Sequence, residues 1–191
     1  MSSQIKHDVL LQENRRAEMA RRLISHGVRT EIITRLTHLT VGRLRTVRRR
    51  VGVENKQRAR GPSRWSLKAF LTTPQARAEG GALVALCWIF GIPIEPNTPA
   101  LPKVVSLDFV DRLCGAYEAF CACHPNTQVE LEHLILIRRG LSVAPKQALV
   151  QLGKCRSCKG LMLELRFGER ECWHCDVEPN RKEPGSRPRT A

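Results

Sequence analysis

The sequence has no apolar run that approaches the roughly 20 residues of a membrane-spanning helix. The longest candidate, residues 81–92, is shorter and is typical of a buried helix. The opening text MSSQIKHDVLLQENRR also lacks an apolar core followed by a small-residue cleavage site, so it does not resemble a secretory signal. We therefore expect a cytoplasmic protein with no membrane partner. In that reducing compartment, CxxC pairs are more often metal ligands than disulfides.

Catalytic motifs are also missing. The sequence contains no paired carboxylates, phosphate-cradling glycine loop, HExxH pair or nucleophile elbow, and its acidic residues are scattered. These absences favour a binding protein over an enzyme.

Acidic residues are few: 18 Asp and Glu stand against 32 Lys and Arg, which gives a net charge of +14. Residues 1–64 hold 16 basic and 5 acidic side chains, a net charge of +11, whereas residues 65–150 hold 7 of each. Residues 151–191 hold 9 basic and 6 acidic side chains, a net charge of +3. This distribution favours a polyanionic partner that meets the first third of the chain.

The apolar spacing predicts a mainly α-helical fold with four parts. These are a basic helical segment with a helix-turn-helix-like element and a linker (1–64), a helical body (65–150), a zinc-ribbon-like module (151–178) and a disordered tail (179–191).

Within these parts, capping and helix-terminating residues mark the bounds of the expected elements. Gly27 should end the first helix, Thr30 and Thr40 should cap the next two, and Gly52 should end the third. Further helices are expected at 66–70, 76–90, 105–123 and 130–139, with another starting at Pro145 and leading into the cysteines, and a strand at 161–167.

Four of the eight cysteines form two CxxC pairs in KCRSCKGLMLELRFGERECWHC: Cys155, Cys158, Cys172 and Cys175. Two intervening residues let a turn aim both thiolates of a pair at one ion, and the 13-residue spacer can form a hairpin that returns the chain to it. We expect one structural zinc ion, with Gly160 supplying conformational freedom after the first turn. His174 is an alternative ligand. Catalytic zinc, a thiol redox pair or ordinary buried or oxidised cysteines are weaker alternatives.

The other cysteines have simpler interpretations. Cys121 and Cys123, next to His124, lack a matching partner cluster, so we interpret them as partly buried thiols at a helix end. Cys87 and Cys114 lie among apolar residues and are expected in the core.

The third expected helix is strongly basic. The text THLTVGRLRTVRRR follows a short apolar-faced helix in the order of a helix-turn-helix, although His38 stands where glycine is common. Its predicted DNA-binding residues are Thr40, Arg43, Arg45, Thr46, Arg48, Arg49 and Arg50. Arginines could read guanine edges or grip phosphates. The alternative is a solvated basic face, and the bend RARGPSRW at 58–65 is equally a phosphate contact or a basic linker.

The order of these parts resembles the flagellar transcriptional activator FlhC family. The matching text is LISHGVRTEIITRLTHLTVGRLRTVRRRVG, then the basic bend with Trp65, and LVQLGKCRSC before the second pair CWHC. The resemblance covers roughly residues 10–176.

The resemblance implies more than the residues do by themselves. Proteins of the family assemble with the small helical protein FlhD into a heterohexamer of four FlhD and two FlhC chains. That complex binds promoter DNA and recruits sigma-70 RNA polymerase to flagellar operons. The family's four zinc-binding cysteines correspond to the two CxxC pairs.

The sequence also departs from the family pattern. The basic run at 48–50 replaces a stretch of mixed charge, and LEHLILIRRGLSVAPKQALVQL lacks the family's aromatics. Such differences are typical of a diverged paralogue whose targets or partner need not be flagellar. The alternative function is a zinc-ribbon scaffold that contacts RNA or protein without sequence-specific DNA binding.

Overall fold

Helices account for most of the structure. The computed structural model describes residues 2–52, 67–94, 99, 101–102, 104–143, 148–165 and 171–176. In chain order its elements are α1 (Ser2–Ser25), α2 (Thr30–Thr37), α3 (Val41–Val51), α4 (Leu67–Phe70), α5 (Pro74–Ile89), α6 (Leu107–Cys123), α7 (Leu131–Leu141), β1 (Val150–Lys154), β2 (Leu161–Leu165) and α8 (Trp173–Asp176). The predicted mainly α-helical class is confirmed. The linker expected at 54–63, the bend at 58–65 and the tail at 179–191 lie outside the described residues.

The first helices begin and end at the predicted capping and terminating residues, with one exception. Gly27 and Gly52 follow α1 and α3 with positive φ angles of 72° and 74°. The Thr40 hydroxyl accepts a hydrogen bond of 3.3 Å from the Arg43 N–H, and so caps α3. Thr30 was expected to cap α2 but is its first helical residue.

The turn between α2 and α3 is held at His38. This residue ends α2 in the left-handed conformation, with φ 57°, which residues other than glycine adopt uncommonly, although His is enriched there together with Asn and Asp. Its Nε2 lies 3.3 Å from the Val105 carbonyl oxygen, just before α6. The turn is therefore connected to a segment 67 residues further along the chain.

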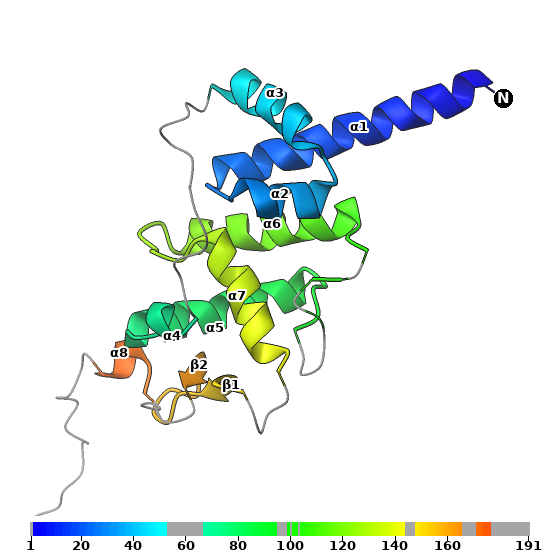
Figure 1. Ribbon diagram of the computed structural model, residues 1–191. Helices are drawn as coiled ribbons and strands as arrows, with labels where there is room; N and C mark the ends of the chain where they lie inside the picture. Colours follow the sequence, from blue (N-terminus) through cyan, green and yellow to red (C-terminus); the bar gives the residue numbers. More distant parts are fainter. Residues whose placement is uncertain are drawn as a thin grey trace, which may run out of the picture.

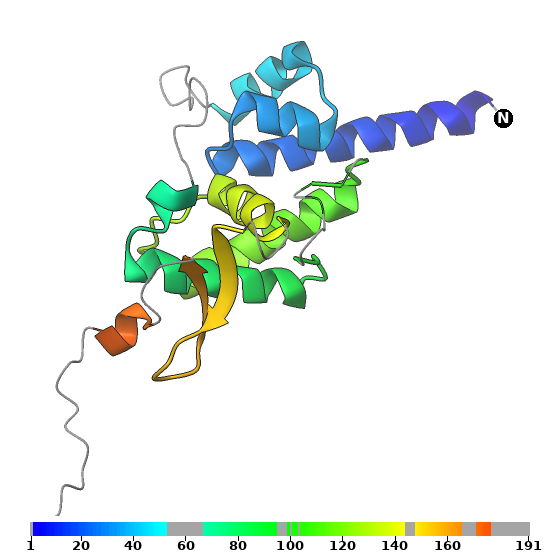
Figure 2. The same cartoon turned by 60° about the horizontal axis from the view of Figure 1, so that its bottom comes forward.

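The N-terminal helices form one side of the molecule. Helix α1 contacts α2, α3 and α6, and α2 also contacts α3 and α6. In Figure 1 the three helices lie above α6, and the N-terminal half of α1 projects beyond the rest of the molecule. The turned view in Figure 2 shows the same projection. No helix within the described ranges is long and apolar enough to cross a membrane.

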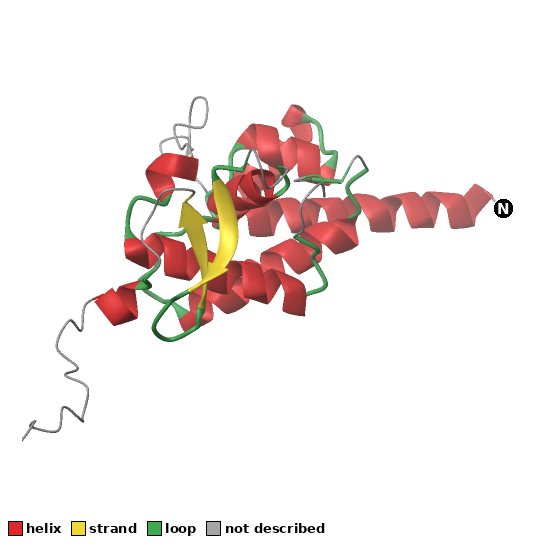
Figure 3. Cartoon of the chain, turned by 90° about the horizontal axis from the view of Figure 1, so that it is seen from below, coloured by secondary structure: helices red, strands yellow, loops and turns green. Residues whose placement is uncertain are grey.

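The opposite side carries a two-stranded sheet. Strands β1 and β2 pair antiparallel, with Val150 opposite Leu165 and Lys154 opposite Leu161. Helix α5 contacts β2, α6, α7 and α8, so it lies between the hairpin and the other helices. Figure 3 shows the two strands crossing this helical layer.

The segment leading into the cysteines differs from its prediction. We expected a helix from Pro145 onward, but residues 150–154 form β1, and residues 144–147 lie outside the described ranges. A short apolar run such as ALVQL suits either element, and pairing with β2 decides the outcome. The expected strand at 161–167 is observed as Leu161–Leu165, with its last two positions outside the description.

One apolar core joins the two sides. A single cluster of buried side chains includes Leu23 of α1, Leu36 of α2, Leu44 of α3, Phe120 of α6 and Leu163 of β2. The N-terminal helices, the helical body and the hairpin therefore share one core.

The hairpin contacts α5 through two adjacent glycines. A Cβ atom on Gly81 would lie 2.6 Å from the Leu161 carbonyl oxygen and 2.6 Å from Met162 Cα. A Cβ atom on Gly80 would lie 2.5 Å from a methyl carbon of Leu163. At Gly81 the obstacle is backbone, which cannot rotate aside as a side chain can. The helix and the strand can approach this closely only because a side chain is absent at position 81.

We therefore expect Gly81→Ala to lower the free energy of unfolding by about 1–3 kcal/mol, the usual cost of overpacking. Gly42→Ala is the matched control, because Gly42 is also helical but nothing lies within 4 Å of its added Cβ atom. The control should be unchanged or more stable by up to about 1 kcal/mol, since alanine is the better helix former. Urea unfolding followed by circular dichroism measures both. Equal stability of the two variants would contradict a close backbone contact.

Candidate metal centre and basic helix

The four cysteines of the CxxC pairs meet at the turn that joins the two strands of the hairpin. Cys155 directly follows β1 and Cys158 lies in the turn before β2, while Cys172 and Cys175 lie just before and within α8. Their Sγ atoms all lie within 4.8 Å of one another. The structure therefore brings together the four predicted ligands, and the cluster could hold one metal ion.

The first pair is shaped by backbone hydrogen bonds. The Cys155 N–H donates to the Gly160 carbonyl at 2.9 Å, and the Lys159 N–H donates to the Cys155 carbonyl at 3.0 Å. The left-handed residue of this turn is Lys159, with φ 62°, and not Gly160 as expected from sequence. Gly160 contributes in another way, because its N–H donates to Cys158 Sγ at 3.4 Å.

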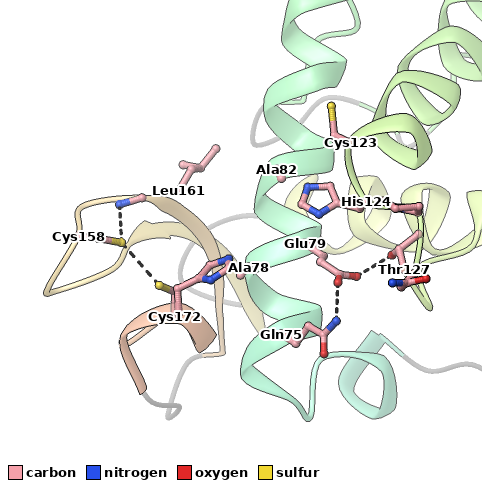
Figure 4. Close-up of a pocket in the computed structure, with 14 residues that line it drawn as sticks. Gln75, Ala78, Glu79, Ala82, Cys123, His124, Thr127, Cys158, Leu161 and Cys172 are labelled. Carbon is pink, nitrogen blue, oxygen red and sulfur yellow. Dashed lines mark hydrogen bonds between the residues drawn. The ribbon is translucent and has the colours of Figure 1, made fainter. Parts of the chain in front are cut away.

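The sulfur geometry suits a tetrahedral ion. A Zn–S bond of about 2.3 Å places two sulfurs of a regular tetrahedron about 3.8 Å apart. Cys158 Sγ and Cys172 Sγ are 3.6 Å apart, as the dashed line in Figure 4 marks. Four thiolates that converge in this way are a donor set that soft and borderline metal ions prefer.

Burial and hydrogen bonding distinguish the ligands. Cys155 is fully buried and Cys172 is 6% exposed, while Cys158 is exposed. Burial by itself opposes ionisation of Cys155, but hydrogen bonds from backbone N–H groups, including that of Cys172 at 3.3 Å, outweigh it and lower its pKa to about 6. The lowered pKa of Cys155 favours its thiolate, and a thiolate is the form that binds metal.

A hollow of about 560 Å³ lies beside the cluster. Figure 4 shows it between α5, which contributes Glu79, the α6–α7 connection at His124, and the two cysteine turns. His174 is exposed and lines this hollow, and it is not one of the four clustered ligands.

The remaining cysteines lie where they were expected, except that Cys123 is exposed and not partly buried. Cys123 is the last residue of α6 and is exposed, and Cys121 is partly buried. Cys87 and Cys114 are fully buried in the core, and this burial raises the pKa of each thiol to about 12.

Helix α3 presents most of the residues that were predicted to contact DNA. Thr40, Arg43, Arg45, Thr46, Arg49 and Arg50 are exposed. Arg45 and Arg49 lie one turn apart and so share a face of the helix. No ion pair within the described ranges involves either of them.

Arg48 differs from the other predicted DNA contacts. It is only 6% exposed and lies on the side of α3 that carries the buried Leu44. Arg48 therefore does not lie on the exposed face of α3, and its predicted contact with DNA does not fit this burial.

Other N-terminal arginines pair with acidic residues inside the molecule. Arg22 of α1 pairs with Asp111 and with Glu118, at 2.7 Å for the latter, and Arg15 pairs with Asp108. Two further pairs are Arg29 with Glu132 at 3.5 Å and Arg43 with Glu13 at 3.0 Å. Arg15 and Arg22 therefore attach α1 to α6, and Arg43 connects the start of α3 to α1.

The acidic partners on α6 were missed in the sequence. Asp108, Asp111 and Glu118 are spaced by three and seven residues, so they share one face of α6. Arg15 and Arg22 have the same seven-residue spacing on α1. The equal spacing of the arginines on α1 and the acids on α6 was the only sign of these ion pairs in the sequence. It was not sufficient, because a row of charged residues on a helix usually faces solvent and does not show which helix it contacts.

Comparison with known proteins adds no assignment: the chain matches no protein-family model, and none of the curated proteins matches it.

Exposed thiols offer a test of the metal centre. Cys158→Ser should reduce bound metal well below one ion per chain and lower thermal stability, because the cluster loses a ligand without losing a packed side chain. Cys123→Ser is the matched control, since Cys123 is also exposed but is not in the cluster. Elemental analysis of both purified variants measures the difference. Retention of one ion by Cys158→Ser would contradict the four-ligand site.

The α1–α6 ion pairs predict a pH dependence. The Arg22 hydrogen bond holds the pKa of Glu118 below its ordinary value of 4.5, against the opposing effect of burial and with help from His26. A lowered folded-state pKa adds stability that is present above pH 4.5 and is lost as pH falls through the folded value. Glu118→Gln should therefore destabilise the protein at pH 7 and have a smaller effect at pH 3.5.

Urea unfolding at the two pH values measures this difference. Glu31→Gln is the control, because Glu31 is exposed on α2 and forms no ion pair within the described ranges. A Glu118→Gln effect that is equal at both pH values would show that the carboxylate charge contributes nothing.

Proposed function

We propose that this protein is a DNA-binding, zinc-containing subunit of a heteromeric transcriptional activator. The observation that carries the proposal is the exposed face of α3, where Arg45 and Arg49 have no ion-pair partner among the described residues. Arg15, Arg22 and Arg29 of the first third pair with acidic residues further along the chain. Arg45 and Arg49, by contrast, place two positive charges, unpaired within the described residues, on one face of α3. A nucleic acid is the polyanion that such a face fits best.

In this proposal, α2, the turn at His38 and α3 act as a helix-turn-helix, with α3 as the recognition helix. Residues near the start of a recognition helix contact base edges, which favours Arg45 as the base-reading residue, and Arg49 one turn later grips phosphate. Thr40 and Thr46 flank them, although both hydroxyls are engaged within α3. Arg43 is drawn toward α1 by Glu13, so we assign it to phosphate contact.

The metal in the proposal is zinc, with a structural role. Four thiolates fill a tetrahedral coordination sphere and leave no position for a reacting water molecule. Few side chains are buried around the cysteines: the small cluster consists of Cys155, Met162 and Cys172, with Ala78 of α5 and Cys175 packed against it. Zinc would supply the folding free energy that so small a cluster lacks.

The partners follow from the resemblance to the FlhC family. We propose that the chain acts in the cytoplasm with an FlhD-like protein, in a heterohexamer of four such chains and two of this one. The assembly would bind flagellar-type promoter DNA and recruit RNA polymerase.

Substitutions on α3 test the DNA contacts. Arg45→Ala should weaken promoter binding by about 1–3 kcal/mol and reduce the preference over scrambled DNA, because a base contact is lost. Arg49→Ala should weaken binding to both DNAs alike and reduce the salt dependence, because a phosphate contact is lost. Arg35→Ala, an exposed arginine on α2, should change neither.

Gel-shift assays measure these effects with the zinc-loaded chain, alone and with the FlhD-like partner. Promoter preference that sharpens when the partner is added would support the activator. Bound zinc without any promoter preference, with or without the partner, would replace the proposal with a zinc-ribbon scaffold.

A further inference from the structure

A groove runs between α1 and α3, on a different side of α3 from Arg45. It has a volume of about 600 Å³, and its α3 wall consists of Val47, Arg50 and Val51. Its α1 wall includes Asn14, Ala17 and Arg21, and it extends to Ser25 at the end of the helix. The groove therefore combines an apolar floor with basic margins.

The α1 wall continues beyond the groove along the projecting half of the helix. Counting back from Asn14 by three and four residues gives Leu11 and Leu10, and a further turn gives His7. Leu10 and Leu11 are 59% and 54% exposed. The same face of α1 therefore runs from His7 to Ser25, a length of about 27 Å at 1.5 Å per residue.

This face differs from the one that α1 buries in the core. Met19, Ala20, Leu23 and Ile24 are buried and point to the other side of the helix. The exposed leucines therefore do not extend the core stripe, and nothing within the described ranges covers them. Most of the stability of a helix in a protein comes from packing of its apolar face. The projecting half of α1 lacks such packing at these two leucines.

The charge of the groove indicates the occupant. Glu18 pairs with Arg21 at 2.6 Å, and Arg22 pairs with Asp111 and Glu118 on α6. Arg50 is exposed at the margin and has no ion pair among the described residues. Of the residues that line the groove, Arg21, Arg22 and Arg50 are basic and only Glu18 is acidic, so the lining carries a net positive charge beside an apolar floor.

We propose that the α1–α3 groove and the leucines that extend it form a docking surface for an acidic amphipathic helix of a partner protein. Apolar side chains of that helix would cover Leu10, Leu11, Val47 and Val51, and acidic residues along its margin would pair with Arg50. This is the helix-in-groove mode of recognition, with anchors repeating every three to four residues.

Two other occupants fit less well. DNA presents phosphates but no apolar ridge that would cover adjacent leucines. A second copy of this chain would bring Arg50 and its basic surroundings against an equally basic surface. The assignment also separates Arg50 from its predicted DNA contact: it belongs to the docking surface, while Arg45 and Arg49 remain on the face proposed for DNA.

This docking surface is separate from the face proposed for DNA. It rests on the proposed function only in that a helical partner of the activator would bind to it. A direct test uses a labelled synthetic helix of five turns, with leucines on one face and glutamates along its margins. Its binding to the zinc-loaded full-length chain is measured by fluorescence anisotropy, without DNA. A control peptide has the same composition and charge with its leucines distributed around the helix.

Matched variants of the chain locate the binding. Leu11→Asp and Arg50→Glu should each weaken the amphipathic peptide at least tenfold. Ile89→Asp, which alters an apolar residue 77% exposed on α5, and Arg35→Glu on α2 should leave it within twofold. The control peptide should bind at least tenfold more weakly than the amphipathic one.

Several outcomes would overturn the inference. Equal binding of the two peptides would show attraction by net charge alone. Equal affinity of Leu11→Asp and Ile89→Asp would show that the groove is not the site. Sedimentation of the unliganded chain as a dimer that Leu11→Asp converts to a monomer would assign the surface to a second copy. A short DNA duplex that displaces the peptide from the unsubstituted chain, and that no longer binds the Arg50→Glu variant, would assign the docking surface to nucleic acid. None of these results depends on whether Arg45 reads promoter bases, so the two proposals fail separately.

Discussion

The backbone contact between α5 and β2 at Gly81 positions the four-cysteine cluster. Because no Cβ atom separates them, the helix lies directly against the strand that follows the first CxxC turn. Ala78, one turn earlier on α5, packs against the small cluster formed by Cys155, Met162 and Cys172. The cysteines thus lie at the edge of the helical body rather than on a separate extension, and order at the metal site is coupled to order in α5.

A second constraint is the use of charge. A net charge of +11 over the first 64 residues indicates a nucleic-acid-facing segment, yet several of those arginines pair with acids on other elements. Ion pairs of this kind contribute little each when exposed, but together they set how α1 lies on α6. The net charge of a segment therefore overestimates the positive charge that a partner can bind. The number of basic side chains without an internal ion pair is the better measure.

The sequence was most informative where the signal is local. Helix ends at Gly27 and Gly52, the Thr40 cap and the spacing of the four cysteines all depend on residues a few positions apart, and the structure has them as predicted. Long-range contacts were not accessible. The strand at 150–154 exists because β2 pairs with it, and Arg48 is buried because of how α3 packs on its neighbours. The identity of the ion and the partners of α3 remain proposals, because spacing specifies a donor set or a charged face without specifying what binds it.

The histidine at the α2–α3 turn has a consequence for the orientation of the basic helix. A glycine at position 38 would adopt the left-handed backbone without cost, but it could not reach the Val105 carbonyl. The His38 side chain therefore connects the turn to the start of α6. This contact adds to the packing of α3 on α1 and α2 and to the Arg43–Glu13 ion pair in setting the direction of α3. The turn therefore has a backbone conformation that is less common for His than for glycine, and it gains a side-chain contact that helps to fix the orientation of α3.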